Sequence, residues 1–223
     1  MLIDRRTMLG LSTIGAGVVV AAPSLAGQAG RPGARIIRQT PPQNIGPFYP
    51  VVRPGENLAD LTRIPNQESR ARGERIEVRC AVKTIAGAPV RGAVVIIWQA
   101  NASGAYNHPG SQFGAADPAF LGHAIVRTDR AGEFSLLTVR PGAYPDMPAT
   151  MRTPHIHFEV IGEEARLITQ MYFPGEPLNA SDRLLRELEA GGGDPRSVTA
   201  TAAAEPGREG AARLDWTIVL DRA

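Results

Sequence analysis

The 223-residue sequence contains a single cysteine, Cys80, and a single lysine, Lys83. One cysteine excludes an intramolecular disulfide framework, so export would not depend on disulfide formation. Because lysine is nearly missing, almost all of the 24 cationic residues are arginines, which we attribute to composition bias. The net charge is only +2 and the cationic residues form no basic tract, so the sequence does not favour nucleic-acid binding.

The first 26 residues lack a hydrophobic run long enough for a membrane span and are predicted to be a targeting signal. Arg5 and Arg6 precede a weakly apolar stretch, and small residues suit cleavage after Ala26. We therefore expect a twin-arginine-type signal peptide over residues 1–26, a linker over residues 27–39, and an exported, periplasmic or secreted protein without a membrane span after processing. A chance arginine pair before a membrane anchor is the alternative. No cysteine follows the cleavage region, which excludes a lipoprotein.

The body of the chain, residues 40–223, has the pattern of one domain rich in short strands. Its 24 Gly and 19 Pro favour turns, and 43% hydrophobic residues allow a sizeable core. In residues 75–84 hydrophobic and charged residues alternate, which places Cys80 on a buried strand face. A hairpin turn is predicted at Asp129–Gly132, and residues 199–211 are expected to form an exposed loop. Further strands are predicted at residues 93–100, 122–128, 133–139, 154–162, 165–173 and 215–220.

One short helix is predicted before the end of the domain. Ser181 can cap its N-terminus, Leu184, Leu185 and Leu188 form its apolar side, and Gly191 ends it. Repeated strands with one short helix and long loops indicate an all-β fold, a β-sandwich.

The sharpest local feature is the pair His155 and His157. Residues i and i+2 of a strand point to the same side, so two imidazoles project into one space, as metal ligation requires. Arg152 adds a fixed positive charge three residues before the first histidine. Two polar strand residues without a metal are the alternative interpretation.

The residues alone leave the rest of a ligand set open. Glu159 could be a surface residue, so a two-histidine, one-carboxylate iron(II) site is not favoured. Zinc would need a third protein ligand, for which His108 and His123 are candidates, although the strand pattern around His123 suits a structural role. Tyr106 and Tyr144 lie in turn-rich loops. A phenolate suits iron(III), whose charge would lower the tyrosine pKa from its usual value of about 10.

Six segments follow one another in a characteristic order: GPFYP (46–50), WQANASGAYNH (98–108), TDRAGEF (128–134), PGAYP (141–145), RTPHIHFEV (152–160) and LITQMYFPGEPLN (167–179). Together they resemble the intradiol ring-cleavage dioxygenases, most of all the type of the protocatechuate 3,4-dioxygenase β subunit. The resemblance covers roughly residues 40–221 and implies the β-sandwich of this family. It also implies a non-haem iron(III) enzyme that inserts both atoms of O₂ into a catechol-type substrate. Cleavage between the two hydroxyl-bearing carbons would give a cis,cis-muconate-type product.

The resemblance also implies roles for individual residues. By motif position, the iron ligands would be Tyr106, Tyr144, His155 and His157, with hydroxide as the fifth ligand. Two phenolates and one hydroxide would balance the charge of iron(III). Tyr144 would leave the iron when the substrate chelates it and would take up a substrate proton. Arg152 would stabilise negative charge on the ring, and Gln170 would lie near iron and substrate.

The sequence departs from the family pattern in ways that leave the ring substituents of the substrate open. Asn107 stands where an arginine is common, and Asp146 stands where the protocatechuate enzymes have an aromatic pocket residue. Only a short linker precedes Thr40, which disfavours the catechol-specific branch with its helical dimerisation region. Tyr49 is predicted to pack structurally, with the pocket as its alternative location.

We expect a homo-oligomer, or an assembly with a second type of subunit, because homologues of this type assemble. Two alternatives to the enzyme are kept. The first is a non-catalytic β-sandwich binding module that retains the scaffold. The second is a zinc hydrolase that uses His155, His157 and a third histidine.

Overall fold

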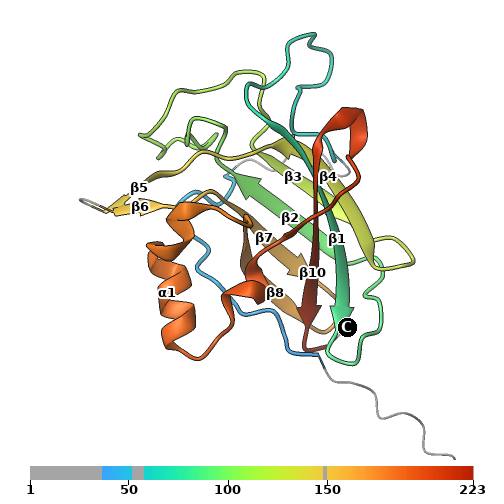
Figure 1. Ribbon diagram of the computed structural model, residues 1–223. Coiled ribbons are helices and arrows are strands. Elements are labelled where there is room, and N and C mark those ends of the chain that lie inside the picture. The colour runs from blue at the N-terminus through green and yellow to red at the C-terminus, as the bar shows by residue number, and fades with distance from the viewer. Residues whose placement is uncertain (1–36, 52–57, 148–149, 223) are drawn as a thin grey trace, which may run out of the picture. The chain divides into compact units, whose positions relative to one another are not determined.

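The computed structural model describes residues 37–51, 58–147 and 150–222, which form two facing four-stranded β-sheets and one small hairpin (Figure 1). The strands are β1 (Arg75–Thr84), β2 (Val94–Gln99), β3 (His123–Arg127), β4 (Glu133–Val139), β5 (Tyr144–Met147), β6 (Thr150–Arg152), β7 (His155–Ile161), β8 (Arg166–Tyr172), β9 (Thr201–Ala202) and β10 (Ala212–Leu220). One sheet has the order β4-β1-β10-β9 and the other β3-β2-β7-β8, while β5 and β6 pair with each other. Only β1 and β10 are parallel among the paired strands of the described chain. The predicted all-β sandwich is confirmed.

The main hydrophobic core lies between the two large sheets. On β1, Ile76, Val78, Cys80 and Val82 occupy alternate positions, and at most 2% of each is exposed. Alternate residues of a strand point to one face, so these side chains pack together against the facing sheet. Full burial of each large aliphatic side chain contributes about 1.5–3 kcal/mol. Burial also raises the pKa of the Cys80 thiol, which is therefore a core side chain, as predicted, and not a nucleophile.

The turn predicted at Asp129–Gly132 is confirmed between β3 and β4. The Gly132 N–H donates to the Asp129 carbonyl over 3.1 Å, and Gly132 has a φ of +76°. A Cβ at this position would lie 2.6 Å from the Val82 carbonyl oxygen, so only glycine fits.

The predicted strands are present, and two predictions need correction. The last strand begins at Ala212, not Asp215. The expected loop at residues 199–211 contains β9 and the short 3₁₀ helix η3 (Arg208–Gly210). The reason is that β10 offers unpaired backbone groups along one edge, and β9 pairs with them.

The predicted helix is α1 (Arg183–Ala190), and it ends at Gly191 as expected. The predicted cap is wrong, because Asp182 and not Ser181 accepts the backbone N–H groups of the second and third helical residues. Ser181 instead follows the 3₁₀ helix η1 (Pro177–Ala180). Both residue types cap helices well, and the tertiary partners of Asp182 decide between them.

The outer face of the second sheet carries a separate hydrophobic cluster, and this face positions the candidate site. On β7, Ile156 and Phe158 belong to the main core, so His155 and His157 point to the opposite face. The buried members of the outer cluster are Phe48, Ile96, Trp98, Ala100, Tyr106, Ile125 and Tyr144. Long loops thus cover a sheet face that would otherwise be open to solvent.

No helix in the described part of the chain is long and apolar enough to cross a bilayer. The predicted signal peptide, residues 1–26, and the linker as far as residue 36 lie outside the described residues. The signal and its cleavage after Ala26 remain predictions.

Candidate metal centre

Two histidines project from β7 into a closed space. His155 and His157 are each only 1% exposed. The pairing of β7 with its neighbours sets Trp98 opposite His157 on one side and Tyr172 opposite His155 on the other. The Trp98 and His157 rings stack with centroids 4.7 Å apart and planes 8° from parallel. Strand register therefore holds both imidazoles side by side, as the alternation predicted.

Tyr106 comes from the loop after β2, and a close backbone approach brings this loop to the segment before Tyr144. The side chain of Asn101 organises the loop by accepting hydrogen bonds from the N–H groups of residues 103 and 105. At Gly104, with φ +84°, a Cβ would lie 2.5 Å from the Ala143 carbonyl oxygen. Glycine therefore permits the two tyrosine-bearing segments to touch.

Tyr144 begins β5 and lies opposite Arg152 of β6 in the hairpin register. The β5–β6 hairpin, which the sequence patterns did not predict, thus places a phenol and a guanidinium together. Both side chains are buried, with 6% and 4% exposed.

Four donor atoms from three separate segments converge on one point. The Nε2 atom of His155 lies 3.3 Å from the Tyr106 Oη, 3.3 Å from the Tyr144 Oη and 3.2 Å from the His157 Nε2. The structure therefore brings together all four residues that the sequence analysis named as ligands.

The imidazole of His155 presents a lone pair to this point. His155 Nδ1 lies 2.6 Å from the Thr153 carbonyl oxygen, which can only accept, so Nδ1 carries the proton and Nε2 is bare. Burial holds the pKa of both histidines well below the usual value, so both rings are neutral. His157 Nδ1 has no hydrogen-bond partner among the described residues.

The two phenols need a cation in order to ionise. Burial raises the pKa of Tyr106 well above its usual value and also raises the pKa of Tyr144. Without a metal both side chains stay protonated at neutral pH. A trivalent ion held between them would reverse this shift and give two hard anionic oxygens. Two neutral nitrogens and two such oxygens form a donor set that fits iron(III).

Other ligand sets find no support in the described ranges. No group of three or more His, Cys, Asp or Glu side chains lies there close enough to hold a metal ion. His108 packs edge-on against Phe48, and its Nδ1 accepts the Gly110 N–H. Glu159 is buried and is not a surface residue. Its carboxylate pairs with Arg166 at 2.6 Å and accepts a hydrogen bond from the Tyr49 hydroxyl at 2.6 Å. Tyr49 accordingly packs away from the donor atoms.

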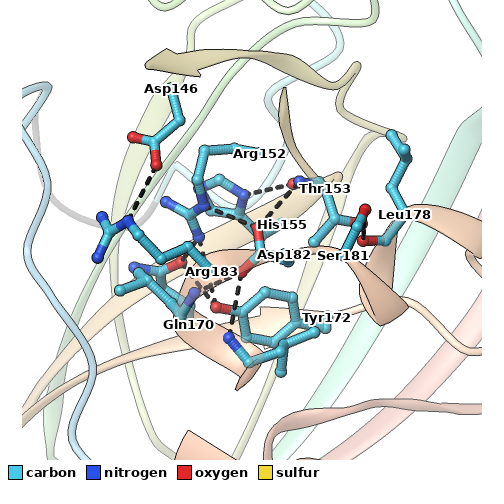
Figure 2. A network of polar contacts seen from close by, with 12 residues as sticks. Asp146, Arg152, Thr153, His155, Gln170, Tyr172, Leu178, Ser181, Asp182 and Arg183 are labelled. Carbon is cyan, nitrogen blue, oxygen red and sulfur yellow. Dashed lines mark hydrogen bonds and ion pairs between the residues drawn. The ribbon is translucent and has the colours of Figure 1, made fainter. Parts of the chain in front are cut away.

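Arg152 is held beside the donors by a buried polar network (Figure 2). Its Nε donates to Asp182 Oδ2 over 2.8 Å, and its Nη2 donates to Gln170 Oε1 over 2.7 Å and to Tyr172 Oη over 3.4 Å. Burial lowers the pKa of Arg152, but Asp182, Tyr144 and Tyr172 together outweigh this effect and the pKa is raised. The guanidinium is therefore a permanent cation next to Tyr144.

Asp182 is the important residue that the sequence analysis missed. It is fully buried and accepts four hydrogen bonds, from the Arg152 Nε, the Thr153 N–H and two N–H groups of α1. Its only sequence signal was its position before the apolar helix pattern, which the adjacent Ser181 shares. Gln170, which was predicted, also donates to the Asn44 carbonyl over 2.7 Å.

A cavity of about 180 Å³ opens beside the donors and is lined by Asn44, Gly46, Pro47, Phe48, Phe113, Tyr144, Pro145, Asp146, Arg152, Arg183 and Leu184. Drug-sized ligands occupy pockets of about 300–1,000 Å³, so this cavity suits a single small ring. Larger hollows also lie elsewhere in the described part of the chain. One, of about 870 Å³, lies over β1, β4 and β10, away from the donors. Another, of about 640 Å³, lies beside the loop around residues 105–120.

Comparisons with known proteins show similarity to dioxygenases. A sequence model of the dioxygenase family matches residues 45–222. The β chain of protocatechuate 3,4-dioxygenase from Burkholderia cepacia is 45% identical over 132 residues, which cover 57% of this chain and 56% of that protein. The α chain from Pseudomonas putida is 30% identical over 162 residues, covering 69% of this chain and 79% of the relative. The chain thus spans only little more than half of the Burkholderia protein.

A solved structure also matches. The dioxygenase domain of a dioxygenase carbohydrate-binding protein fusion from Streptomyces sp. SirexAA-E superposes with a TM-score of 0.63 at 29% identity. The match covers 83% of this chain and all of that domain. Fold and site together define an all-β sandwich with a buried nitrogen and oxygen donor site. The chain belongs to the intradiol ring-cleavage dioxygenase family.

Proposed function

We propose that this protein is a non-haem iron(III) dioxygenase that cleaves a catechol-type ring between its two hydroxyl-bearing carbons. Both atoms of O₂ would enter the substrate and the product would be of the cis,cis-muconate type. The observation that carries the proposal is the approach of two phenol oxygens and the His157 Nε2 atom to within 3.2–3.3 Å of His155 Nε2. The names of the relatives, which are ring-cleaving dioxygenases, support the same reaction class.

Tyr106, Tyr144, His155 and His157 would hold the iron. When bound, iron(III) would supply the redox chemistry that makes a chelated catecholate ring reactive toward O₂. The protein contributes a nearly dry site, since at most 7% of each of the four side chains is exposed. Exclusion of water strengthens every electrostatic interaction inside the site.

Two residues beside the cavity have roles in this reaction. Tyr144 lines the cavity, so its Oη is placed to take up a proton from a substrate hydroxyl. Arg152 also lines the cavity and would stabilise negative charge that develops on the ring. Gln170 does not line it, and its part is to hold the Arg152 guanidinium in place.

Oxygen uptake by the iron-loaded full-length protein, screened against substituted catechols, tests the proposal. We expect uptake of one O₂ per ring cleaved and a product that absorbs as a muconate. Protein that binds no iron, or iron-loaded protein that cleaves none of the rings, would favour a non-catalytic sandwich module.

The four tyrosines of the chain allow a matched test of the ligands. Tyr106→Phe and Tyr144→Phe should each weaken and shift the visible absorption of the iron-loaded protein, because each removes a phenolate. Tyr144→Phe should also slow turnover by about 100-fold or more, since it loses a proton acceptor. Tyr49→Phe is the control and should keep the colour, because the Tyr49 hydroxyl donates to Glu159. Unchanged colour in both ligand variants would contradict the assignment.

We also propose that the protein is exported by the twin-arginine route and that it forms a homo-oligomer or an assembly with a second type of subunit. The arginine pair at Arg5 and Arg6 supports the first point. Similarity to both an α and a β chain of protocatechuate 3,4-dioxygenase supports the second. Cell fractionation and light scattering of the purified protein test them.

A further inference from the structure

Two arginines line the cavity beside the donors, and both are already paired with carboxylates. Arg152 is bound to the buried Asp182, as described above. Arg183, the first residue of α1, lies with its Nε 3.2 Å from Asp146 Oδ2 and its Nη1 2.8 Å from Glu187 Oε1. Figure 2 shows the contact between Arg183 and Asp146 next to the Arg152 network. The charge of each guanidinium is thus already balanced by at least one carboxylate, although each keeps N–H groups that can still donate to a bound ring.

The charge around the cavity is therefore not positive. The charged lining residues are Asp146, Arg152 and Arg183. With the partners Asp182 and Glu187 included, two cations face three carboxylates. Asp146 is the carboxylate on the cavity wall, two residues after Tyr144, and its side chain is 20% exposed. The other lining residues carry no charge, among them Phe48, Phe113, Pro145 and Leu184.

We infer that Asp146, with Arg183 as its partner, makes this cavity select dihydroxybenzenes that carry no anionic substituent on the ring. The inference rests on the proposed function and specifies its substrate class. A ring carboxylate would meet Asp146 as a like charge, and the two cations of the cavity wall are already balanced by carboxylates, which opposes its binding. An uncharged ring keeps the Arg183–Asp146 contact and packs against the apolar wall.

A comparison of catechol with 3,4-dihydroxybenzoate tests this inference on the iron-loaded full-length protein. The unmodified protein should show a kcat/KM for catechol that is higher by about tenfold or more. Asp146→Asn removes the like charge and releases Arg183, so the preference for catechol should fall by about tenfold. Asp215→Asn breaks a similar ion pair, with Arg213 at 2.8 Å on β10, and should leave the preference unchanged.

A binding measurement separates failure of this inference from failure of the proposed function. Phenol and 4-hydroxybenzoate differ only in the carboxylate, and calorimetry gives their dissociation constants without any turnover. Phenol should bind more tightly, and Asp146→Asn should reduce the difference. A preference of the unmodified protein for the carboxylated ring, or a ratio that Asp146→Asn does not move, would overturn the inference. If no catechol is cleaved, the proposed function fails and the two dissociation constants still decide the selectivity.

Discussion

Alanine in place of His155 should lower the affinity for iron by more than about 100-fold and abolish ring cleavage. His155 Nε2 is the atom that lies within 3.3 Å of all three other donors, so its loss removes the centre of the set. Loss of an outer-shell partner alone typically costs about 10–100-fold in metal affinity, and a direct ligand should cost more. Iron stoichiometry after gel filtration and the visible spectrum measure the effect.

His108→Ala is the matched control, because His108 lies on the same loop as Tyr106 but outside the converging donors. It should retain iron and colour. Because His155 is only 1% exposed, its replacement could disturb folding, so circular dichroism of His155→Ala must show an intact sandwich. A folded His155→Ala protein with full iron content and unchanged colour would refute the site.

Substitution of Asp182 by asparagine should lower the free energy of unfolding by about 3–5 kcal/mol, the usual cost of leaving one partner of a buried ion pair alone. Asp182 is 0% exposed and Arg152 is 4% exposed, so water cannot replace the lost charge. The two carboxylate oxygens have separate tasks. Oδ1 accepts the N–H groups that cap α1, whereas Oδ2 accepts the Arg152 Nε and the Thr153 N–H. Asparagine can keep the cap but would turn an N–H₂ group toward two donors.

Urea unfolding of the metal-free protein measures this effect apart from any change in iron binding. Asp194→Asn is the control. Asp194 also caps a short helix, η2 (Pro195–Val198), and also pairs with an arginine, Arg196, but on the surface. Its substitution should leave the unfolding midpoint nearly unchanged, because exposed ion pairs contribute little. Equal destabilisation by the two variants would show that the buried ion pair of Asp182 contributes no more to stability than the exposed pair of Asp194.

The same variant also bears on function. With Asp182 gone, Arg152 keeps only Gln170 and Tyr172 as partners and can turn away from the cavity. We therefore expect turnover to fall while the iron colour remains, since Asp182 accepts its hydrogen bonds from Arg152, Thr153 and α1 and not from the four donor residues. Asp182 is in this sense a positioning residue for Arg152.

The strands could be predicted from the sequence because hydrophobic and polar residues alternate within each strand, over only a few neighbouring positions. Residues 75–84 show this best, since prediction and strand coincide and Cys80 lies on the buried face. The same alternation predicted that His155 and His157 share one side of β7. It could not show that the side is the outer face of the sheet, because that depends on which strands lie next to β7.

Local sequence patterns were not enough to assign Tyr106 and Tyr144 as ligands. Periodicity made each a possible oxygen ligand and no more, and the family resemblance supplied the pairing with the histidines. In space, Tyr106 meets His155 across 49 positions of sequence and Tyr144 meets it across 11. The close contact at Gly104 and the β5–β6 hairpin create these approaches, and neither has a periodic signature.

By itself, then, the sequence determined the sandwich strands, the short helix, the buried thiol and the histidine pair, because hydrophobic alternation and turn residues act over a few neighbouring positions. Only the tertiary structure decided which other residues contact these elements. It chose Asp182 over Ser181, directed the Thr153 carbonyl to His155 Nδ1, and set Arg183 against Asp146 at the cavity. These contacts join residues that are 2 to 37 positions apart in the sequence. Each one uses a carboxylate or carbonyl oxygen, and the fold of the backbone decides which donor reaches that oxygen. A buried charge must find its partner wherever the folded chain places one.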